Sequence, residues 1–275
     1  MVMRTRRKLI WWIGGLVALV VVVAVAGPFI YIHFIEGPAP TKLTLPATHT
    51  SNPASAATGS TASSSAVTGT WNVGPGSVAG YRVQEVLVGQ NATAVGRTSA
   101  VWGSLTISGT SVTKGSFTVD MASVVSDQSE RNAQFDGRIM DVTQYPTATL
   151  VLTSPIALGT FPAVGSTERY PAQGTLTMHG VSKPVTFTVK AERNGSETDV
   201  LADLPITFAD WNIANPSVGG FVTTADNGIL EVLLHLTTGT GNAPSTSSAG
   251  STAGGGGGPV TVPSTTVPPL TVPSG

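Results

Sequence analysis

Hydrophobic and polar residues alternate along much of the middle of the chain. The pattern is clearest over residues 116–121, 185–190 and 230–237, where every second side chain is apolar. A period of two places successive side chains on opposite faces of a β-strand, so each segment predicts a strand with one apolar face. No long stretch between residues 70 and 238 shows the ~3.6-residue period of an amphipathic helix. The pattern therefore predicts an all-β domain.

Turn-forming residues separate the predicted strands. Asn194-Gly195 lies between two such segments, and this dipeptide is a strong signal for a β-hairpin because both residues tolerate positive φ. Glycines recur between the other segments. Short strands, frequent turns and the lack of a long helix indicate an antiparallel sandwich or barrel.

One segment of the middle region departs from this alternation. Residues 126–145, SDQSERNAQFDGRIMDVTQY, are mainly charged and polar, and Pro146 follows them. A connection of ~20 residues inside a compact domain is usually functional or covers an opening. We expect a long loop with one or two helical turns here, as a candidate lid.

The N-terminus carries an apolar run that is long enough to cross a membrane. Residues 9–35 contain no Asp, Glu, Lys or Arg, and residues 1–8 before them are basic. Leu9–Ala26 alone would form a helix of ~27 Å, close to the ~30 Å hydrocarbon layer. Because basic residues favour the cytoplasmic side, we expect a cytoplasmic segment 1–8, a transmembrane signal anchor 9–35 and an extracytoplasmic domain. The alternative is a cleavable signal peptide, since Ala24-Val25-Ala26 has the small-x-small form of a cleavage site.

Two low-complexity segments flank the predicted domain. Residues 36–68 are rich in Pro, Ala, Ser and Thr and lack apolar periodicity, so we expect a disordered linker with a root-mean-square reach of ~30 Å. Residues 239–275 contain a glycine run and repeated Val-Pro steps, which predict a disordered tail. The folded domain is therefore expected over residues 69–238.

Charge and composition exclude several classes of function. Residues 70–238 hold nine Lys and Arg against fourteen Asp and Glu, a net charge of −5. An acidic domain without a basic cluster does not suit nucleic acid, whose phosphates require one. The chain contains no cysteine, which excludes disulfides, thiolate metal ligands and a cysteine nucleophile.

Four short motifs follow one another in order between residues 69 and 237. They are GTWNV at 69–73; RN at 131–132 with GRIMDV at 137–142 and YPTAT at 145–149; GTLTMHGVSKPV at 174–185; and ITFADW at 206–211 with GILE at 228–231. In this order they resemble the YceI-like family, the exported lipocalin-like barrels associated with polyisoprenoid binding. Asn132 departs from the family, which often has Asp after the Arg. The resemblance implies an eight-stranded antiparallel barrel with one long loop or short helix, an elongated apolar cavity for an isoprenoid chain, and no catalytic residues.

Inward-facing apolar side chains would contact a lipid such as a polyisoprenoid or an isoprenoid quinone. The candidate cavity-lining residues are Phe117, Val119, Leu176, Met178, Phe187, Val189, Val232 and Leu234. An eight-stranded barrel is only just wide enough for one small ligand, so the same residues could instead fill the core. The second interpretation is therefore a non-enzymatic envelope interaction module with a filled core.

Arg131 and Arg138 in the candidate lid are the candidates for binding a lipid head group. A guanidinium offers a planar fork of donors that suits a phosphate or a quinone at the barrel mouth. The competing interpretation is that both arginines form solvated ion pairs with Glu130, Asp136 and Asp141.

Motifs for catalysis or metal binding are weak in this chain. The run SVTK at 111–114 has Ser-x-x-Lys spacing, but it lies at a predicted strand turn and lacks the partner motifs of penicillin-recognising enzymes. His179 and His235 are the histidines of the domain, and neither belongs to a ligand-spaced pair. We expect no enzyme, cofactor or metal site; an enzymatic function would require Asp210, Glu231 and His235 around one pocket. The sequence leaves open whether the barrel forms a homodimer.

Overall fold

The computed structural model describes residues 12, 15–23, 39–46, 67–126, 128–159, 163–239 and 241. Between residues 67 and 239 most residues lie in strands, and their pairings are antiparallel. The strands are β1 (Gly69–Val73), β2 (Val78–Leu87), β3 (Gln90–Thr98), β4 (Val101–Ser108), β5 (Ser111–Asp120), β6 (Val125–Ser126), β7 (Thr147–Leu152), β8 (Ile156–Ala157), β9 (Thr167–Met178), β10 (Val181–Asn194), β11 (Glu197–Thr207), β12 (Val222–Thr224) and β13 (Asn227–Thr237). The all-β prediction is confirmed.

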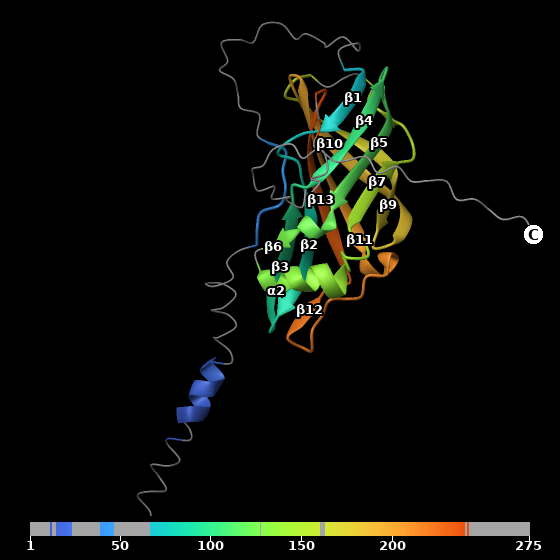
Figure 1. Cartoon of the computed structure of the whole chain (residues 1–275). Helices are drawn as coiled ribbons and strands as arrows, with labels where there is room; N and C mark the ends of the chain where they lie inside the picture. The colour runs from blue at the N-terminus through green and yellow to red at the C-terminus, as the bar shows by residue number, and fades with distance from the viewer. Residues whose placement is uncertain are drawn as a thin grey trace, which may run out of the picture. The chain divides into compact units, whose positions relative to one another are not determined.

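Eight of these strands close into a barrel (Figure 1). Their order is β1-β4-β5-β7-β9-β10-β11-β13, and the ring closes because β1 also pairs with β13. At one end β2 takes over from β1 along β13, and β3 pairs with β2 to extend the wall. The predicted eight-stranded antiparallel barrel is confirmed.

The turn between β10 and β11 is the predicted hairpin. Asn194 pairs with Glu197 across Gly195 and Ser196. Gly195 has a φ of +67°, a left-handed conformation that glycine adopts without steric strain. The hairpin expected at Asn194-Gly195 is therefore confirmed.

Alternation along the strands divides the side chains between the barrel interior and its outer face. Buried interior residues form two clusters along the barrel, one around Trp71 and Leu234 and the other around Phe135 and Met178. The Trp71 indole N–H donates to the carbonyl oxygen of Val67 at 2.9 Å, which satisfies the polar atom of this buried ring.

The segment expected as a lid is helical at its centre. Helix α2 covers Ser129–Gln134 and continues as one π-helical turn, η5, over Phe135–Ile139. The Phe135 ring is buried and stacks on Tyr81 of β2 with 5.2 Å between ring centroids. Figure 1 places α2 at the same end of the barrel as β12. Two short 3-10 helices, η4 (Met121–Ser123) and η6 (Phe208–Trp211), follow β5 and β11.

Upstream of the barrel, residues 15–23 are helical. The described part of the chain contains no helix that is both long and apolar enough to cross a membrane. Most of the span expected at 9–35 lies outside the described residues, as does nearly all of the tail expected at 239–275.

Residues 39–46, called the strap below, contact the outer face of the barrel. Arg82 donates from Nη2 to the carbonyl oxygen of Pro40 at 2.7 Å, and Arg97 donates from Nη2 to the carbonyl oxygen of Thr41. Both arginines pair with Glu231, which is fully buried although it faces outward from β13. This part of the expected linker is hydrogen-bonded to the barrel.

Candidate ligand-binding cavity

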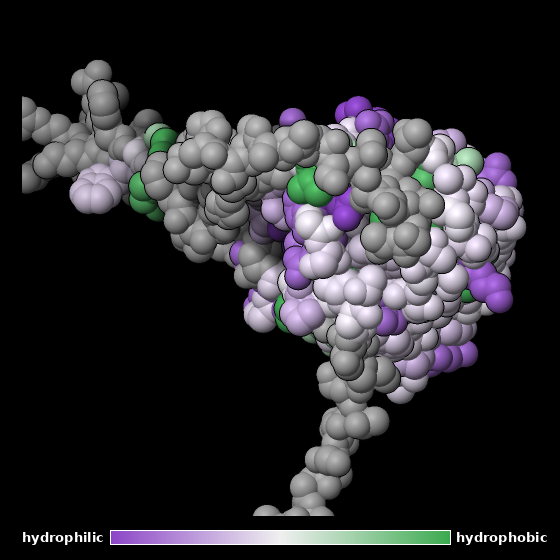
Figure 2. Space-filling model, turned by 90° about the horizontal axis from the view of Figure 1, so that it is seen from above, coloured by the Kyte–Doolittle hydropathy of each residue, from purple (hydrophilic) through white to green (hydrophobic). Residues whose placement is uncertain are grey.

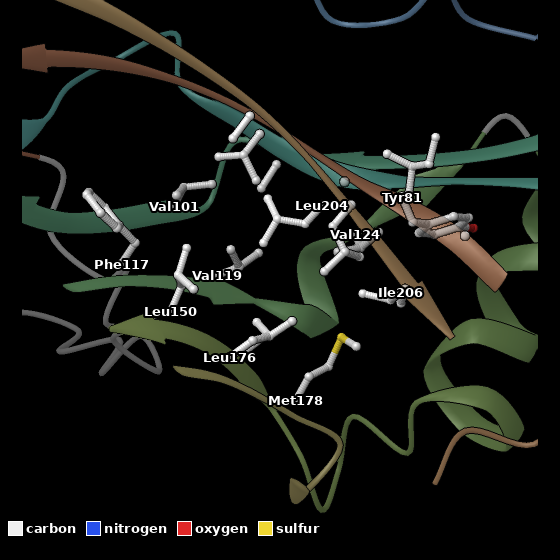
Figure 3. A pocket seen from close by; sticks show the side chains of 18 of the residues that line it. Tyr81, Val101, Phe117, Val119, Val124, Leu150, Leu176, Met178, Leu204 and Ile206 are labelled. Carbon is white, nitrogen blue, oxygen red and sulfur yellow. The ribbon is translucent and has the colours of Figure 1, made fainter. Parts of the chain in front are cut away.

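A cavity of about 580 Å³ runs inside the barrel, and its lining is almost wholly apolar. Figure 3 shows Phe117, Leu150, Leu176 and Met178 pointing into it from β5, β7 and β9. Ligand pockets in proteins typically measure ~300–1,000 Å³ and have mainly apolar walls. The volume and the lining of this cavity therefore suit an apolar ligand.

All eight candidate cavity-lining residues lie on this wall. They come in pairs from four strands: Phe117 and Val119 from β5, Leu176 and Met178 from β9, Phe187 and Val189 from β10, and Val232 and Leu234 from β13. Sequence alternation could place them there because positions two apart in a strand face the same side. Their contact with a lipid stays a prediction.

The alternative interpretation requires a core filled by side chains. Instead, the described side chains enclose a cavity of about 580 Å³, and small residues such as Ala79, Ala94, Ala148 and Ala202 belong to its lining. The residues that the structure describes thus leave an unfilled space inside the barrel, and a filled core is not what they form.

The cavity reaches the surface at the end of the barrel where α2 and β12 lie. The exposed residues Glu130, Arg138 and Val218 belong to its lining at this end. At the opposite end the lining residues Val67 and Ile156 are buried, and Arg193 and Thr198 are half-buried. We call the end at α2 and β12 the mouth.

A partly buried ion pair crosses from the barrel wall to α2 at the mouth. Arg131 donates from Nη2 to Glu85 Oε1 at 2.8 Å, and their side chains are 16% and 8% exposed. Glu85 lies on β2 between the wall residues Val83 and Leu87. Glu85 was not among the predicted site residues, although a single acid in the apolar alternation of β2 is a visible signal. The Arg131 guanidinium thus supplies hydrogen-bond donors at the mouth, and the Glu85 carboxylate balances its charge.

Arg138 is exposed and lies beside the mouth. Its Nε donates to Gln134 Oε1 at 2.8 Å, and its Nη2 donates to the carbonyl oxygen of Pro216 at 3.0 Å. These partners are neutral, unlike the carboxylates that the ion-pair interpretation assigned to Arg138. The structure brings both head-group candidates to the mouth, and their contact with a head group stays a prediction.

The half of the cavity away from the mouth holds a buried tyrosine. Tyr170 lines the cavity, and its hydroxyl has no hydrogen-bond partner among the residues that the structure describes. Burial raises the pKa of Tyr170 above its ordinary value, and the nearby charge of Glu168 adds to the effect. The hydroxyl is therefore protonated and neutral at physiological pH.

The three residues that an enzymatic function would require lie in separate ion pairs. Asp210 pairs with Lys183 at 2.6 Å, and His235 pairs with Asp199. Glu231 belongs to the arginine cluster beneath the strap. None of the three is among the described residues of the cavity wall, so the structure does not bring them around one pocket.

The chain is similar to several solved structures. The chain is similar to a polyisoprenoid binding domain from Saccharophagus degradans implicated in plant cell wall breakdown. The TM-score is 0.51 at 16% identity, over 62% of this chain and 98% of that chain. Burkholderia cenocepacia BcnA gives a TM-score of 0.44 at 23% identity, over 56% of this chain and 95% of that chain. The YCEI protein of Campylobacter jejuni gives a TM-score of 0.38 at 16% identity, over 50% of this chain and 83% of that chain.

The comparison with curated proteins gives no match. In contrast, the sequence model of the YceI-like domain matches residues 53–236, more than half of the chain and almost the entire barrel. The four motifs singled out in the sequence fall within this range. The chain therefore belongs to the family of proteins with a YceI-like domain.

Proposed function

We propose that the barrel binds an isoprenoid-type lipid, either a polyisoprenoid or an isoprenoid quinone, and acts as a non-enzymatic carrier or reservoir outside the cytoplasmic membrane. The observation that carries this proposal is the cavity of about 580 Å³, whose lining is almost wholly apolar, with Glu85, Glu130, Arg131 and Arg138 at the mouth. The similar domain from Saccharophagus degradans is described as polyisoprenoid binding, which supports the choice of ligand class.

Transfer energetics favour a carrier over a permanent store. Moving each ligand CH₂ from water into the cavity stabilises the complex by ~0.8 kcal/mol, so a few isoprene units suffice for strong retention. A lipid tail in a bilayer is already in apolar surroundings, so exchange between membrane and cavity is nearly neutral. Shape and head-group contacts then decide the direction of exchange.

The mouth provides two places for a head group. Arg131 offers donors but is balanced by Glu85, whereas Arg138 is exposed and pairs with neutral acceptors. We assign the head group to this region, since polar groups are scarce on the wall farther inside. Donors at the mouth and an apolar interior would orient the lipid with its tail inward.

We infer the place of the barrel in the cell from the N-terminal sequence. The apolar run at 9–35 and the basic residues at 1–8 support a single-pass protein with a cytoplasmic N-terminus and an extracytoplasmic barrel. Protease added to intact spheroplasts is expected to digest the strap and barrel but to leave a tag at residue 1 uncut. Protection of the barrel in intact spheroplasts would contradict this topology.

Lipid extraction from the full chain tests the proposed function. Val189→Trp adds an indole that projects into the cavity from β10. Thr188→Trp adds the same indole one position earlier, where the side chain is exposed on the outer face of the barrel. The proteins are purified in detergent, extracted with organic solvent, and their isoprenoid content per protein is measured by mass spectrometry. We expect isoprenoid in the unmodified chain and in Thr188→Trp, and its loss in Val189→Trp.

The stability of the same variants distinguishes an open cavity from a filled core. In a filled core the added indole of Val189→Trp would cost ~1–3 kcal/mol in unfolding free energy. In an open cavity it costs little, so Val189→Trp and Thr188→Trp should unfold at similar temperatures. Equal isoprenoid content in all folded variants, or none in any, would overturn the proposed function.

A further inference from the structure

Three exposed apolar side chains gather at the mouth. Val88 lies in the turn between β2 and β3, and Val218 and Phe221 lie in the loop before β12; their exposed fractions are 51%, 48% and 68%. The two segments are adjacent because the Val88 N–H donates to the carbonyl oxygen of Phe221 at 2.8 Å. Leu87 also pairs with Val222 across β2 and β12. We call Val88, Val218 and Phe221 the tip.

The tip forms part of the cavity rim. Val218, Val222 and Leu87 all line the cavity, so apolar surface continues from the wall to the exposed tip. The polar residues Glu130 of α2 and Arg138 of η5 also line the cavity at the mouth. A lipid that moves along the tip side of the mouth therefore keeps contact with apolar side chains.

Val88 occupies a backbone conformation that its side chain disfavours. Its φ is +47°, in the left-handed region, and Gly89 after it has a φ of +81°. Turns of this kind favour Asn-Gly, because a β-branched side chain clashes with its own backbone at positive φ. An apolar side chain is thus held at an exposed turn despite backbone strain, and strain of this sort occurs where function requires a particular side chain.

The opposite end of the barrel presents a different surface. Figure 2 views that end, and the coloured residues there are mainly pale or purple, with isolated green ones. At this end Val164 is 62% exposed, and the N–H of the next residue, Gly165, donates to the carbonyl oxygen of Arg193. Val164 thus offers a matched apolar position away from the mouth.

The strap gives an independent indication of which end faces a membrane. The carbonyl oxygen of Pro40 accepts from Arg82, and that of Thr41 accepts from Arg97. Arg97 of β3 lies opposite Gly80 of β2, which is farther from the mouth than Arg82. The chain therefore runs away from the mouth as it leaves Pro40, and its upstream end points toward the mouth. Residues 36–39 extend at most ~14 Å, comparable with the ~17 Å along β2 from Arg82 to Leu87. A span ending at residue 35 is therefore within reach of about the level of the tip.

We infer that the tip inserts into the interfacial layer of the membrane that the N-terminal segment enters, so that the mouth opens onto lipid. Aromatic and aliphatic side chains at a protein end are suited to the boundary between head groups and acyl chains. Arg138 donates to the carbonyl oxygen of Pro216 in the loop before β12, which places its positive charge beside the phosphates of the lipid head groups. The inference rests on the proposed function for its purpose, the transfer of an apolar ligand without passage through water.

Depth-dependent quenching tests the insertion. Because the chain has no cysteine, a single Val218→Cys or Ser196→Cys can be labelled with an environment-sensitive fluorophore in the full chain. The chains are reconstituted in vesicles of phosphatidylcholine and phosphatidylglycerol that contain nitroxide-labelled phosphatidylcholine. We expect a blue-shifted emission and quenching at position 218 and neither at 196, which lies in the β10–β11 turn. Equal quenching at the two positions would overturn the inference.

Charge substitutions separate this inference from the proposed function. Phe221→Asp is expected to slow the transfer of an isoprenoid from vesicles to the barrel without lowering the amount bound at equilibrium, whereas Val164→Asp should leave the rate unchanged. A Val88→Cys label repeats the quenching measurement if the Val218 variant does not fold. If the barrel binds no isoprenoid but the tip is quenched, the proposed function fails and the insertion stands. If isoprenoid binds but position 218 is not quenched, only the insertion fails.

Discussion

Nη2 of Arg131 in α2 lies 2.8 Å from Oε1 of Glu85 in β2, and this ion pair joins the helical segment to the cavity wall. Both side chains are largely removed from water, so loss of either partner leaves a poorly solvated charge. The pair holds α2 over the mouth and balances the charge of Arg131. A neutral head group meets little net charge here, whereas a phosphate would compete with Glu85 for the guanidinium.

Glu85→Gln is expected to shift the head-group preference toward anionic lipids. The substitution removes the carboxylate that competes for Arg131, and a change of ~1.4 kcal/mol in relative binding corresponds to about tenfold in the ratio of Kd values. Competition between polyprenyl phosphate and polyprenol for the full chain measures this ratio. Glu197→Gln, at the exposed start of β11 beside the β10–β11 turn, serves as the control and should leave it unchanged. An unchanged ratio in Glu85→Gln would place the head group away from the pair.

Gly96→Ala is expected to destabilise the mouth through a steric clash. A Cβ at this position would lie 2.3 Å from Tyr81 Cε1, and the Tyr81 ring stacks on Phe135 of the helical segment. Relief of the clash must move Tyr81 and disturb that stack, at a cost of ~1–3 kcal/mol in unfolding free energy. Thermal unfolding measures the loss. Gly137→Ala is the matched control, because no atom lies within 4 Å of its Cβ position.

The wall of the cavity could be predicted from the sequence because a strand encodes its buried face in a period of two. Phe117 and Val119 on β5 are two positions apart, so they can be placed on one face without knowledge of distant residues. The same holds for Val232 and Leu234 on β13. The hairpin between β10 and β11 is local for a similar reason, since two adjacent residues determine its turn.

The contacts of Glu85 and the strap could not be predicted in the same way. Arg131 and Glu85 are 46 positions apart in the sequence. They come into contact only because the fold places α2 across the mouth. The strap binds through backbone carbonyl oxygens such as that of Pro40, and every residue has such an acceptor. Nothing in the identity of these residues distinguishes them from the rest of the expected linker.

Tyr170→Phe is expected to maintain or raise stability and to alter its dependence on alkaline pH. The hydroxyl is buried without a partner among the described residues, so its removal relieves a desolvation cost of ~1–3 kcal/mol. Burial raises the pKa of Tyr170 in the folded chain above its unfolded value of about 10, so the folded state holds this proton more tightly. The resulting stability is complete below pH ~10 and is lost as the pH rises through the folded pKa.

Unfolding of the unmodified chain and Tyr170→Phe between pH 8 and about 11 measures this difference. The unmodified chain should lose more stability above pH ~10 than Tyr170→Phe. Parallel curves for Tyr170→Phe and the unmodified chain would show that the Tyr170 hydroxyl is solvated in the folded state.

Glu231→Gln is expected to destabilise the barrel and to release the strap together. Glu231 is fully buried between Arg82 and Arg97, so neutralising it leaves two guanidinium groups without their counter-charge. Removing one partner from a buried ion pair typically costs ~3–5 kcal/mol, and the exposed edge of Arg97 places the expected loss at the lower end. Because the same arginines bind Pro40 and its neighbour, their rearrangement should also free the strap.

Hydrogen exchange of the full chain, read by mass spectrometry, separates the two effects. Arg97→Ala removes one of the two donors to the strap and one of the two bonds to Glu231, so the barrel should remain folded while the amides of residues 41–45 exchange faster. Lys190→Ala is the control, because it removes a basic side chain from β10, which pairs with β9 and β11, and it should leave strap exchange unchanged. If the strap exchanged as fast in the unmodified chain as in Arg97→Ala, the arginine cluster would not hold it to the barrel in solution.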